Sequence, residues 1–346
     1  MFCECSDLTQ VKLPSHVTSI GNNAFKGCSS LQEITIPSLV KEIKSFAFSG
    51  CSLLTQIIIP SSVKSIESYA FSGCFSLTTI SINSSLTSIG QNVFDGVQSL
   101  EIIGDIGYIP ESMFLECQSL TKIKLSSRIT SIDSQAFDGC TSLTQVTIPI
   151  YATTIGKSAF NNCSSLAQIT IPSSVKSIES FAFSGCSSLT QVTIPSSVKS
   201  IGSSAFSECS SLTQITLPSS IESIEPYVFY QCSSLTQVTI PSSVKIIKSF
   251  AFCKCFSLSQ ITIPSSVEII QLSAFDGCSS LTHVTIPFSV QSIEESAFAN
   301  CSSLTQFHIP CFLHLDKWKV FKGVSQNVTV IRDTVNHDHD DDNQNG

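Results

Sequence analysis

The chain has 346 residues, of which only 13% are charged, and its formal net charge is −8 at pH 7. Half of that charge lies in the last sixteen residues, so the rest of the chain is nearly neutral and lacks the basic stripe of a nucleic-acid-binding protein. The sequence contains no uninterrupted apolar run of about 18 residues, the length that a membrane-spanning helix requires.

A leucine recurs along the chain in steps of 23 residues, and the residues around it recur with it. The copies begin at Leu8, Leu31, Leu54, Leu77, Leu100, Leu120, Leu143, Leu166, Leu189, Leu212, Leu235, Leu258, Leu281 and Leu304. Residues 189–209 show the unit, L-x-x-[IV]-x-I-P-x-x-V-x-x-I-x-x-x-A-F-x-x-C. Such a period is the signature of a solenoid, because each unit buries its apolar side chains against its neighbours. We therefore predict a right-handed, β-rich leucine-rich-repeat superhelix of about 14 rungs, with one strand in each 23-residue rung.

Every unit predicts the same elements in the same order. Its leucine, the [IV] position and the isoleucine before proline are spaced by three and two residues, which predicts a strand, roughly residues 191–194 in one copy. The proline that follows lacks an N–H group and ends the strand. The next Val and Ile predict a second short extended stretch, and S-x-A-F predicts one helical or 3₁₀ turn. A glycine before the cysteine, such as Gly185, suits the left-handed residue that ends this turn.

The phenylalanine of the unit recurs in every copy and predicts a stacked spine in the core. Each buried ring contributes about 1.5–3 kcal/mol by transfer from water. The members of this column are Phe25, Phe48, Phe71, Phe94, Phe114, Phe137, Phe160, Phe183, Phe206, Phe229, Phe252, Phe275, Phe298 and Phe321.

Thirteen of the sixteen cysteines occupy one position of the unit, which predicts a ladder of buried, reduced thiols. Side chains stacked in parallel would need distortion to reach the torsion of a disulfide. The ladder cysteines form no C-x-x-C pair, so we expect no zinc site and no other metal or cofactor. Outside the ladder lie Cys3, Cys253 and Cys311, which we expect to be the thiols that react in the native protein.

The sequence indicates one continuous domain and a tail. Residues 1–322 form the solenoid, which begins in the middle of a repeat and contains a shortened copy over residues 100–119, with three residues missing around 104–109. Residues 311–330, which contain the only Trp, are expected to cap the C-terminal end. Residues 331–346 are expected to be a disordered acidic tail.

Repeats such as C-S-S-L-T-Q-V-T-I-P-S-S-V-K-S-I-G-S-S-A-F resemble the BspA-like surface antigens, a leucine-rich-repeat family of bacteria and parasitic protists. The resemblance covers nearly all of residues 1–322. It implies a location at the cell surface or outside the cell, and adhesion to host extracellular-matrix proteins or cell-surface proteins.

The sequence leaves the compartment open. The first five residues already lie in the repeat register and show neither a basic nor an apolar segment of a signal peptide. A truncated copy of a longer surface protein, unconventional export, and a cytoplasmic leucine-rich-repeat scaffold are all compatible with this, as is a nonfunctional gene copy. Sequons at Asn83, Asn162, Asn300 and Asn327 matter only in a secretory pathway.

The candidate partner-binding residues lie two and four positions after the leucine, where strand alternation points side chains away from the core. In the regular copies they are uncharged and include Gln145, Thr147, Gln168, Thr170, Gln191, Thr193, Gln214, Thr216, Gln237, Thr239, Gln260 and Thr262. Such a face can hydrogen-bond a partner without the cost of desolvating charges. The alternative is that these residues suit an exposed strand and were copied with the repeat.

His283 lies two positions after the leucine of its copy, and His308 lies four positions after the leucine of the next copy. Both therefore belong to the candidate binding face. They are expected to be diagonal neighbours about 7–8 Å apart, able to share a metal or to sense pH, although ordinary surface positions explain them as well. The sequence contains no G-x-G-x-x-G, Walker-type loop or H-E-x-x-H, so we expect no catalytic site and no enzyme.

Overall fold

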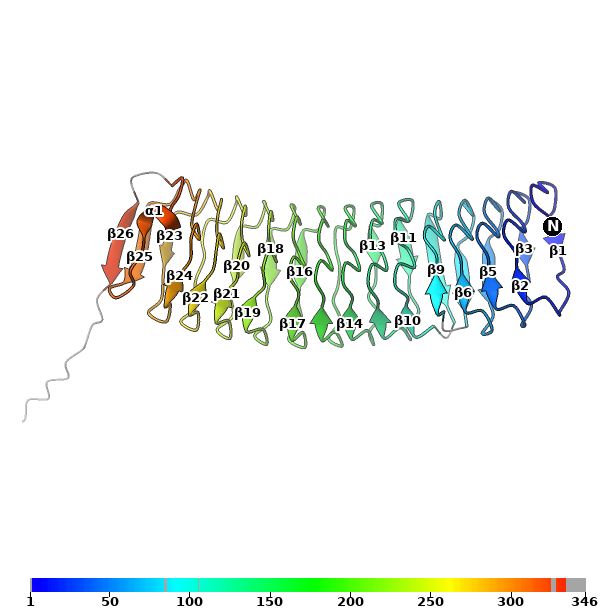
Figure 1. Ribbon diagram of the computed structural model, residues 1–346, viewed down its shortest axis with the longest axis horizontal. Coiled ribbons are helices and arrows are strands. Elements are labelled where there is room, and N and C mark those ends of the chain that lie inside the picture. The colour runs from blue at the N-terminus through cyan, green and yellow to red at the C-terminus, as the bar shows by residue number, and fades with distance from the viewer. Residues whose placement is uncertain (1, 84–85, 105, 325–327, 334–346) are drawn as a thin grey trace, which may run out of the picture.

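The computed structural model describes residues 2–83, 86–104, 106–324 and 328–333. Each repeat forms one rung, and the rungs stack in chain order into an elongated parallel β-solenoid (Figure 1). The predicted repeat solenoid is confirmed. Its core is the series of apolar repeat positions, which form one buried cluster from Ile20 to Val320.

In most rungs a first strand begins after the leucine, and we call this series the first ladder. Strand β9 begins one residue before Leu100, and the rungs of Leu166 and Leu258 contribute single bridges. Parallel pairing joins the members of the first ladder into four groups, β1 with β3, β5 to β13, β16 to β20, and β23 to β26. Its strands are β1 (Gln10–Val11), β3 (Glu33–Ile34), β5 (Gln56–Ile59), β7 (Thr79–Ile82), β9 (Ser99–Ile103), β11 (Lys122–Lys124), β13 (Gln145–Val146), β16 (Gln191–Thr193), β18 (Gln214–Thr216), β20 (Gln237–Thr239), β23 (His283–Thr285), β25 (Gln306–Pro310) and β26 (Thr329–Asp333).

The second extended stretch of the unit is itself a paired strand in most rungs, and we call this series the second ladder. Its isoleucine is buried or half-buried beside the spine. The strands are β2 (Ser19–Ile20), β4 (Glu42–Ile43), β6 (Ser65–Ile66), β8 (Ser88–Ile89), β10 (Tyr108–Ile109), β12 (Ser131–Ile132), β14 (Thr154–Ile155), β15 (Ser177–Ile178), β17 (Ser200–Ile201), β19 (Ser223–Ile224), β21 (Ile246–Ile247), β22 (Ile269–Ile270) and β24 (Ser292–Ile293).

The turn that carries the phenylalanine is not a regular helix, so the helical alternative is wrong. Single i→i+3 hydrogen bonds of the 3₁₀ type do occur in it, such as Ser184 N–H to the Phe181 carbonyl at 3.1 Å, but not at consecutive residues. The rungs from Phe25 to Phe298 each place two residues in the left-handed region, such as Phe181 (φ 60°) and Gly185 (φ 71°). Between them, Phe183 N–H donates to the carbonyl of Ala205 in the next rung at 2.8 Å. A helix would direct these N–H groups along the chain, whereas the stack satisfies them across rungs. The expectation of a left-handed glycine before the cysteine is confirmed.

The phenylalanine rings stack face to face, and their spacing reports the spacing of the rungs. Most neighbouring ring centroids lie 5.0–5.5 Å apart. Wider spacings of 5.8 and 6.1 Å precede Phe94 and Phe229. In these two rungs Val93 and Val228 replace the alanine of A-F. Met113 also replaces it, and there the ring spacing is 5.3 Å.

The sequence predicts a ring stack that continues to Phe321. The parallel stack instead ends at Phe298. Phe298 contacts Phe307 edge to face at 4.9 Å, and Phe307 contacts Phe321 in the same way at 4.8 Å. Phe307 occupies the [IV] position of its repeat, where its larger side chain inserts between the other two rings.

The C-terminal end combines a short helix, α1 (Lys317–Val320), with strand β26, which pairs in parallel with β25. Ile331, Arg332 and Asp333 therefore extend the first ladder, beyond the boundary predicted for the solenoid. The remainder of the predicted tail, residues 334–346, lies outside the described residues, so its disorder stays a prediction.

The strand register changes once along the first ladder, at the shortened repeat. The other paired residues of this ladder are 23 apart, such as Gln56 and Thr79. Between β7 and β9 they are 22 apart, since Thr79 pairs with Glu101. In the second ladder, β8 and β10 belong to different sheets of the described structure. The deletion is therefore absorbed by both ladders rather than by residues 104–109 alone.

Candidate binding surface

The predicted Gln and Thr residues all lie exposed on the outward face of the first ladder, between buried Val or Ile residues. In β16, β18 and β20 they form two columns in register, one of Gln191, Gln214 and Gln237 and one of Thr193, Thr216 and Thr239. Single bridges continue the columns to Gln168 and Thr262. At the other end, Gln145 lies opposite Lys122.

The side chains of these twelve residues form no hydrogen bond within the described part of the chain. Their neighbours one position after the leucine behave differently, because the hydroxyl groups of Thr213 and Thr236 donate to carbonyl oxygens of the preceding rung at 3.2 Å. The amide and hydroxyl groups of the two columns are therefore free to bond to a partner.

The two histidines lie on this face as the sequence predicts, with His283 opposite Gln306 and His308 opposite Thr285. They are therefore diagonal neighbours. His283 Nδ1 lies 3.1 Å from the hydroxyl of Thr282, and His308 Nδ1 lies 3.3 Å from Oδ1 of Asp333. This carboxylate was not expected there, because Asp333 was assigned to the tail. Among the described residues, no group of three His, Cys, Asp or Glu side chains could hold a metal ion.

A groove of about 800 Å³ runs along the first ladder where the regular columns meet the shortened repeat. It crosses β11, β13 and the rung of Leu166, and its rim includes Lys122 and Lys124. Four predicted binding residues line it, namely Gln145, Thr147, Gln168 and Thr170. The groove therefore belongs to the predicted binding face and gives it a shape that an extended chain can follow.

Two exposed isoleucines on the same ladder were missed by the sequence reasoning. Ile58 is 61% exposed and Ile103 is 42% exposed, and both pair with Ser81 on the strand between them. The signal for Ile58 is present in the sequence, because it occupies the position at which regular copies carry Thr. Ile103 gave no such signal, since its orientation depends on the register change.

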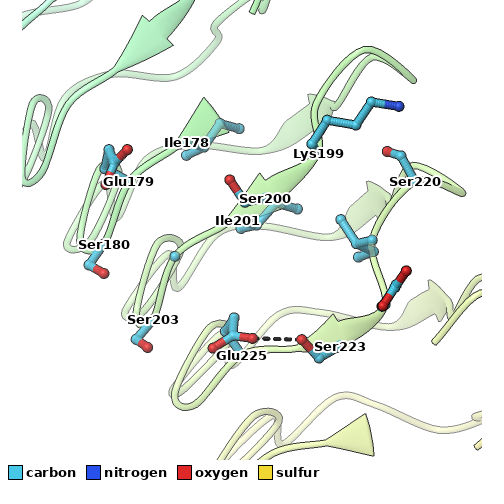
Figure 2. Close-up of a pocket in the computed structure, with 13 residues that line it drawn as sticks. Ile178, Glu179, Ser180, Lys199, Ser200, Ile201, Ser203, Ser220, Ser223 and Glu225 are labelled. Carbon is cyan, nitrogen blue, oxygen red and sulfur yellow. Dashed lines mark hydrogen bonds between the residues drawn. The ribbon is translucent and has the colours of Figure 1, made fainter. Parts of the chain in front are cut away.

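A second cleft, of about 480 Å³, opens between β17 and β19, where the second ladder is interrupted (Figure 2). Its lining consists largely of Ser, Ile and Glu, and Ser223 donates a hydrogen bond to Glu225 at 2.6 Å. The phenylalanine rings of the rungs that carry β17 and β19 are also the most widely spaced of the stack, at 6.1 Å. The lining includes the carboxylates of Glu179, Glu222 and Glu225 and contains no His or Cys.

Apart from Cys5, the ladder cysteines are buried, and buried thiols are unreactive. Burial raises the pKa of Cys51 and Cys209 to about 12. Two predictions about individual thiols are wrong, because Cys5 is exposed at the first rung whereas Cys253 is buried. Cys5 lacks a preceding rung in the described chain to cover it, and Cys253 packs between neighbouring turns.

The chain is similar to known leucine-rich-repeat proteins. A family model described as BspA type leucine rich repeat region (6 copies) matches residues 1–106, 107–236 and 199–329. No curated protein matches the chain. Within the described residues, no helix is long and apolar enough to cross a membrane.

Solved structures of bacterial repeat proteins are similar over most of the chain. A leucine-rich repeat protein from Bacteroides ovatus is 29% identical, with a TM-score of 0.64, and the match covers 94% of this chain and 92% of that one. A leucine-rich repeat protein from Eubacterium ventriosum is 24% identical, with a TM-score of 0.53 and coverage of 83% and 86%, which supports the fold alone. A leucine rich cell surface protein from Faecalibacterium prausnitzii is 31% identical, with a TM-score of 0.42 and coverage of 92% and 83%.

Proposed function

Because the chain belongs to the BspA-type leucine-rich-repeat proteins, we propose that it is a non-enzymatic protein that binds another protein on the outward face of its first ladder. The observation that carries this proposal is the pair of Gln and Thr columns, whose twelve polar side chains are exposed and make no hydrogen bond to any other described residue. A partner can bond to them without displacing an existing interaction. Their lack of charge keeps the cost of desolvation low.

The partner class follows from the family and is part of the proposal. An adhesin-like surface antigen would present the first ladder to a host extracellular-matrix protein or to a cell-surface protein. The same Gln and Thr residues recur on successive rungs of a long face. Such a face can contact a large protein surface, because several rungs contribute to the binding energy. His283 and His308 would contribute at the C-terminal end of the same face.

A second candidate, an intracellular scaffold for protein–protein interaction, is favoured by the buried thiol ladder. Cysteines kept reduced are typical of a reducing compartment. Fractionation of the native source separates the two candidates, because the first requires the protein on the cell surface and the second requires it in the cytosol.

Binding to the first ladder can be tested with one sheet-face variant and one control. Immobilised chain is exposed to purified extracellular-matrix proteins and, in parallel, to cytosolic extract, and the dissociation constant of each bound partner is measured. The double variant Gln191→Glu with Thr193→Lys should weaken binding and leave the thermal transition nearly unchanged. The control Lys199→Glu, beside the second ladder, should do neither. Loss of binding in the control with full binding by the double variant would refute the assigned face.

A further inference from the structure

The first ladder departs from the Gln and Thr pattern around the shortened repeat. Ile58 on β5, Ser81 on β7 and Ile103 on β9 lie in one line across three paired strands. The isoleucines are the exposed large apolar side chains of this ladder among the described residues. An apolar centre with a polar surround is the arrangement found at protein-binding sites.

The register change is what turns Ile103 outward. A step of 23 residues from β7 would place Ile103 opposite Ile80, which faces the core. The observed step of 22 instead places Ile102 opposite Ile80 and Ile103 opposite the outward Ser81. A slip of one residue exchanges the two faces of a strand. The register change therefore exposes an apolar side chain that the regular register would bury.

Positive charge lies beside this apolar centre. On the next strand, β11, Lys122 and Lys124 point outward, and Lys124 Nζ lies 2.6 Å from Oε1 of Glu101. Both members of that ion pair are exposed, so it contributes little and can be exchanged for a contact with a partner. Lys122 forms no ion pair within the described residues. Lys122, Lys124 and Glu101 together carry one net positive charge, which a carboxylate of the partner can match.

The groove continues this surface over Gln145 and Gln168. From Ile58 to Thr170 this surface crosses five strand intervals, which at about 4.8 Å each span roughly 24 Å. The column of Thr170 meets β9 at Glu101, two residues before Ile103. An extended polypeptide of about seven residues covers that length at roughly 3.3 Å per residue. Its polar backbone can bond to the free amide groups of the Gln column.

We propose that the first ladder from Ile58 to Thr170 is the docking site of an extended protein segment that carries an apolar side chain and, a few residues away, an acidic one. The apolar side chain packs on Ile58 and Ile103, the acidic one pairs with Lys122, and the remainder lies in the groove. This inference rests on the proposed function and names the partner's chemistry and the place where it binds.

The probe is a library of random twelve-residue peptides displayed on phage and selected on the immobilised full chain. Enriched peptides should share an aliphatic or aromatic residue with Asp or Glu a few positions before or after it. The affinity of a synthetic enriched peptide should fall about tenfold in the Ile58→Thr/Ile103→Thr double variant and in Lys122→Gln, as for loss of a central contact. Added salt should weaken binding to the unmodified chain and have less effect on Lys122→Gln.

There are two matched controls. Leu39→Thr removes an apolar side chain that is 49% exposed and lies outside this region, and Lys199→Gln removes a positive charge outside it. Both should bind the peptide as the unmodified chain does. Thr is the residue that regular copies carry at the position of Ile58, so that variant should fold, and an unchanged thermal transition confirms it.

Enrichment of basic peptides, absence of any enrichment, or full affinity in the isoleucine double variant would overturn the inference. If enriched peptides respond instead to Gln191→Glu with Thr193→Lys, the docking site is wrong while binding on the first ladder stands. If the chain binds neither peptides nor any protein in the partner screen, the proposed function fails as well.

Discussion

The thiol of Cys209 donates a hydrogen bond to the backbone carbonyl of Phe183 in the preceding rung, at 3.2 Å. The same carbonyl accepts the N–H group of Cys186 within its own rung, also at 3.2 Å. Corresponding thiol bonds link the other regular rungs from Cys28 to Cys301. The cysteine column therefore supplies a small buried side chain that can also donate to a buried acceptor.

Replacing Cys209 by Ala should destabilise the adjoining rungs by about 1–3 kcal/mol, because it removes the donor to Phe183 and leaves a small void. Hydrogen exchange of the amides near Cys186 and Cys209 measures this loss of protection. The exposed Cys311 provides the control, and its change to Ala should leave exchange unaltered. Equal effects of the two substitutions would contradict a role for the thiol bond.

Thiol labelling without denaturant should modify Cys3, Cys5 and Cys311, which are exposed, and spare the thirteen buried cysteines until the protein unfolds. Burial keeps these thiols protonated, since it raises the pKa of Cys117, Cys209 and Cys301 to about 12. Mass spectrometry of the labelled chain counts the modified sites. Rapid native labelling of Cys163 or Cys186 would refute the burial that we describe.

The same thiols should make the protein sensitive to alkali. Their pKa is higher in the folded chain than in the unfolded one, so their contribution to stability is full below about pH 9, the ordinary pKa range of a thiol, and is lost as the pH rises toward 12. Thermal transitions measured from pH 7 to pH 11 should fall most steeply above pH 9. A midpoint independent of pH over this range would contradict the prediction.

Val228→Ala should draw two rungs together. The Phe206 and Phe229 rings are 6.1 Å apart across Val228, and smaller spacings accompany Ala at this position. We expect β17 and β19 to pair, and the amide of Glu222 to exchange more slowly than it does in the unmodified chain. The reverse change, Ala205→Val, should open the preceding interface. Unchanged exchange in both variants would mean that this side chain does not set the spacing.

Phe206→Ala should cost about 3–5 kcal/mol, because the neighbouring rings cannot collapse fully into the space that a buried ring leaves. Rungs contact mainly their nearest neighbours, so the loss should stay local. Hydrogen exchange should show reduced protection near Phe183 and Phe229 and normal protection near Phe48. A uniform loss from end to end would rule out this one-dimensional behaviour.

The repeat itself carried the information needed to predict the rungs, the buried columns and the outward Gln and Thr positions. A period of 23 residues with apolar spacings of three and two leaves few ways to bury the core, and each copy reports the same answer. Leu189, Phe206 and Cys209 are fully buried for that reason. The exposed position of Ile58 could also have been recognised, since it replaces a Thr.

Contacts between rungs were decided by the tertiary structure, because a repeat pattern says which residues are buried but not how neighbouring copies align where the pattern changes. The outward turn of Ile103 follows from a one-residue change in pairing with β7. Asp333 reaches His308 because β26 adds to the edge of β25. The left-handed residues of the turn, such as Phe181, arise because backbone N–H groups bond to the next rung instead of forming a helical turn.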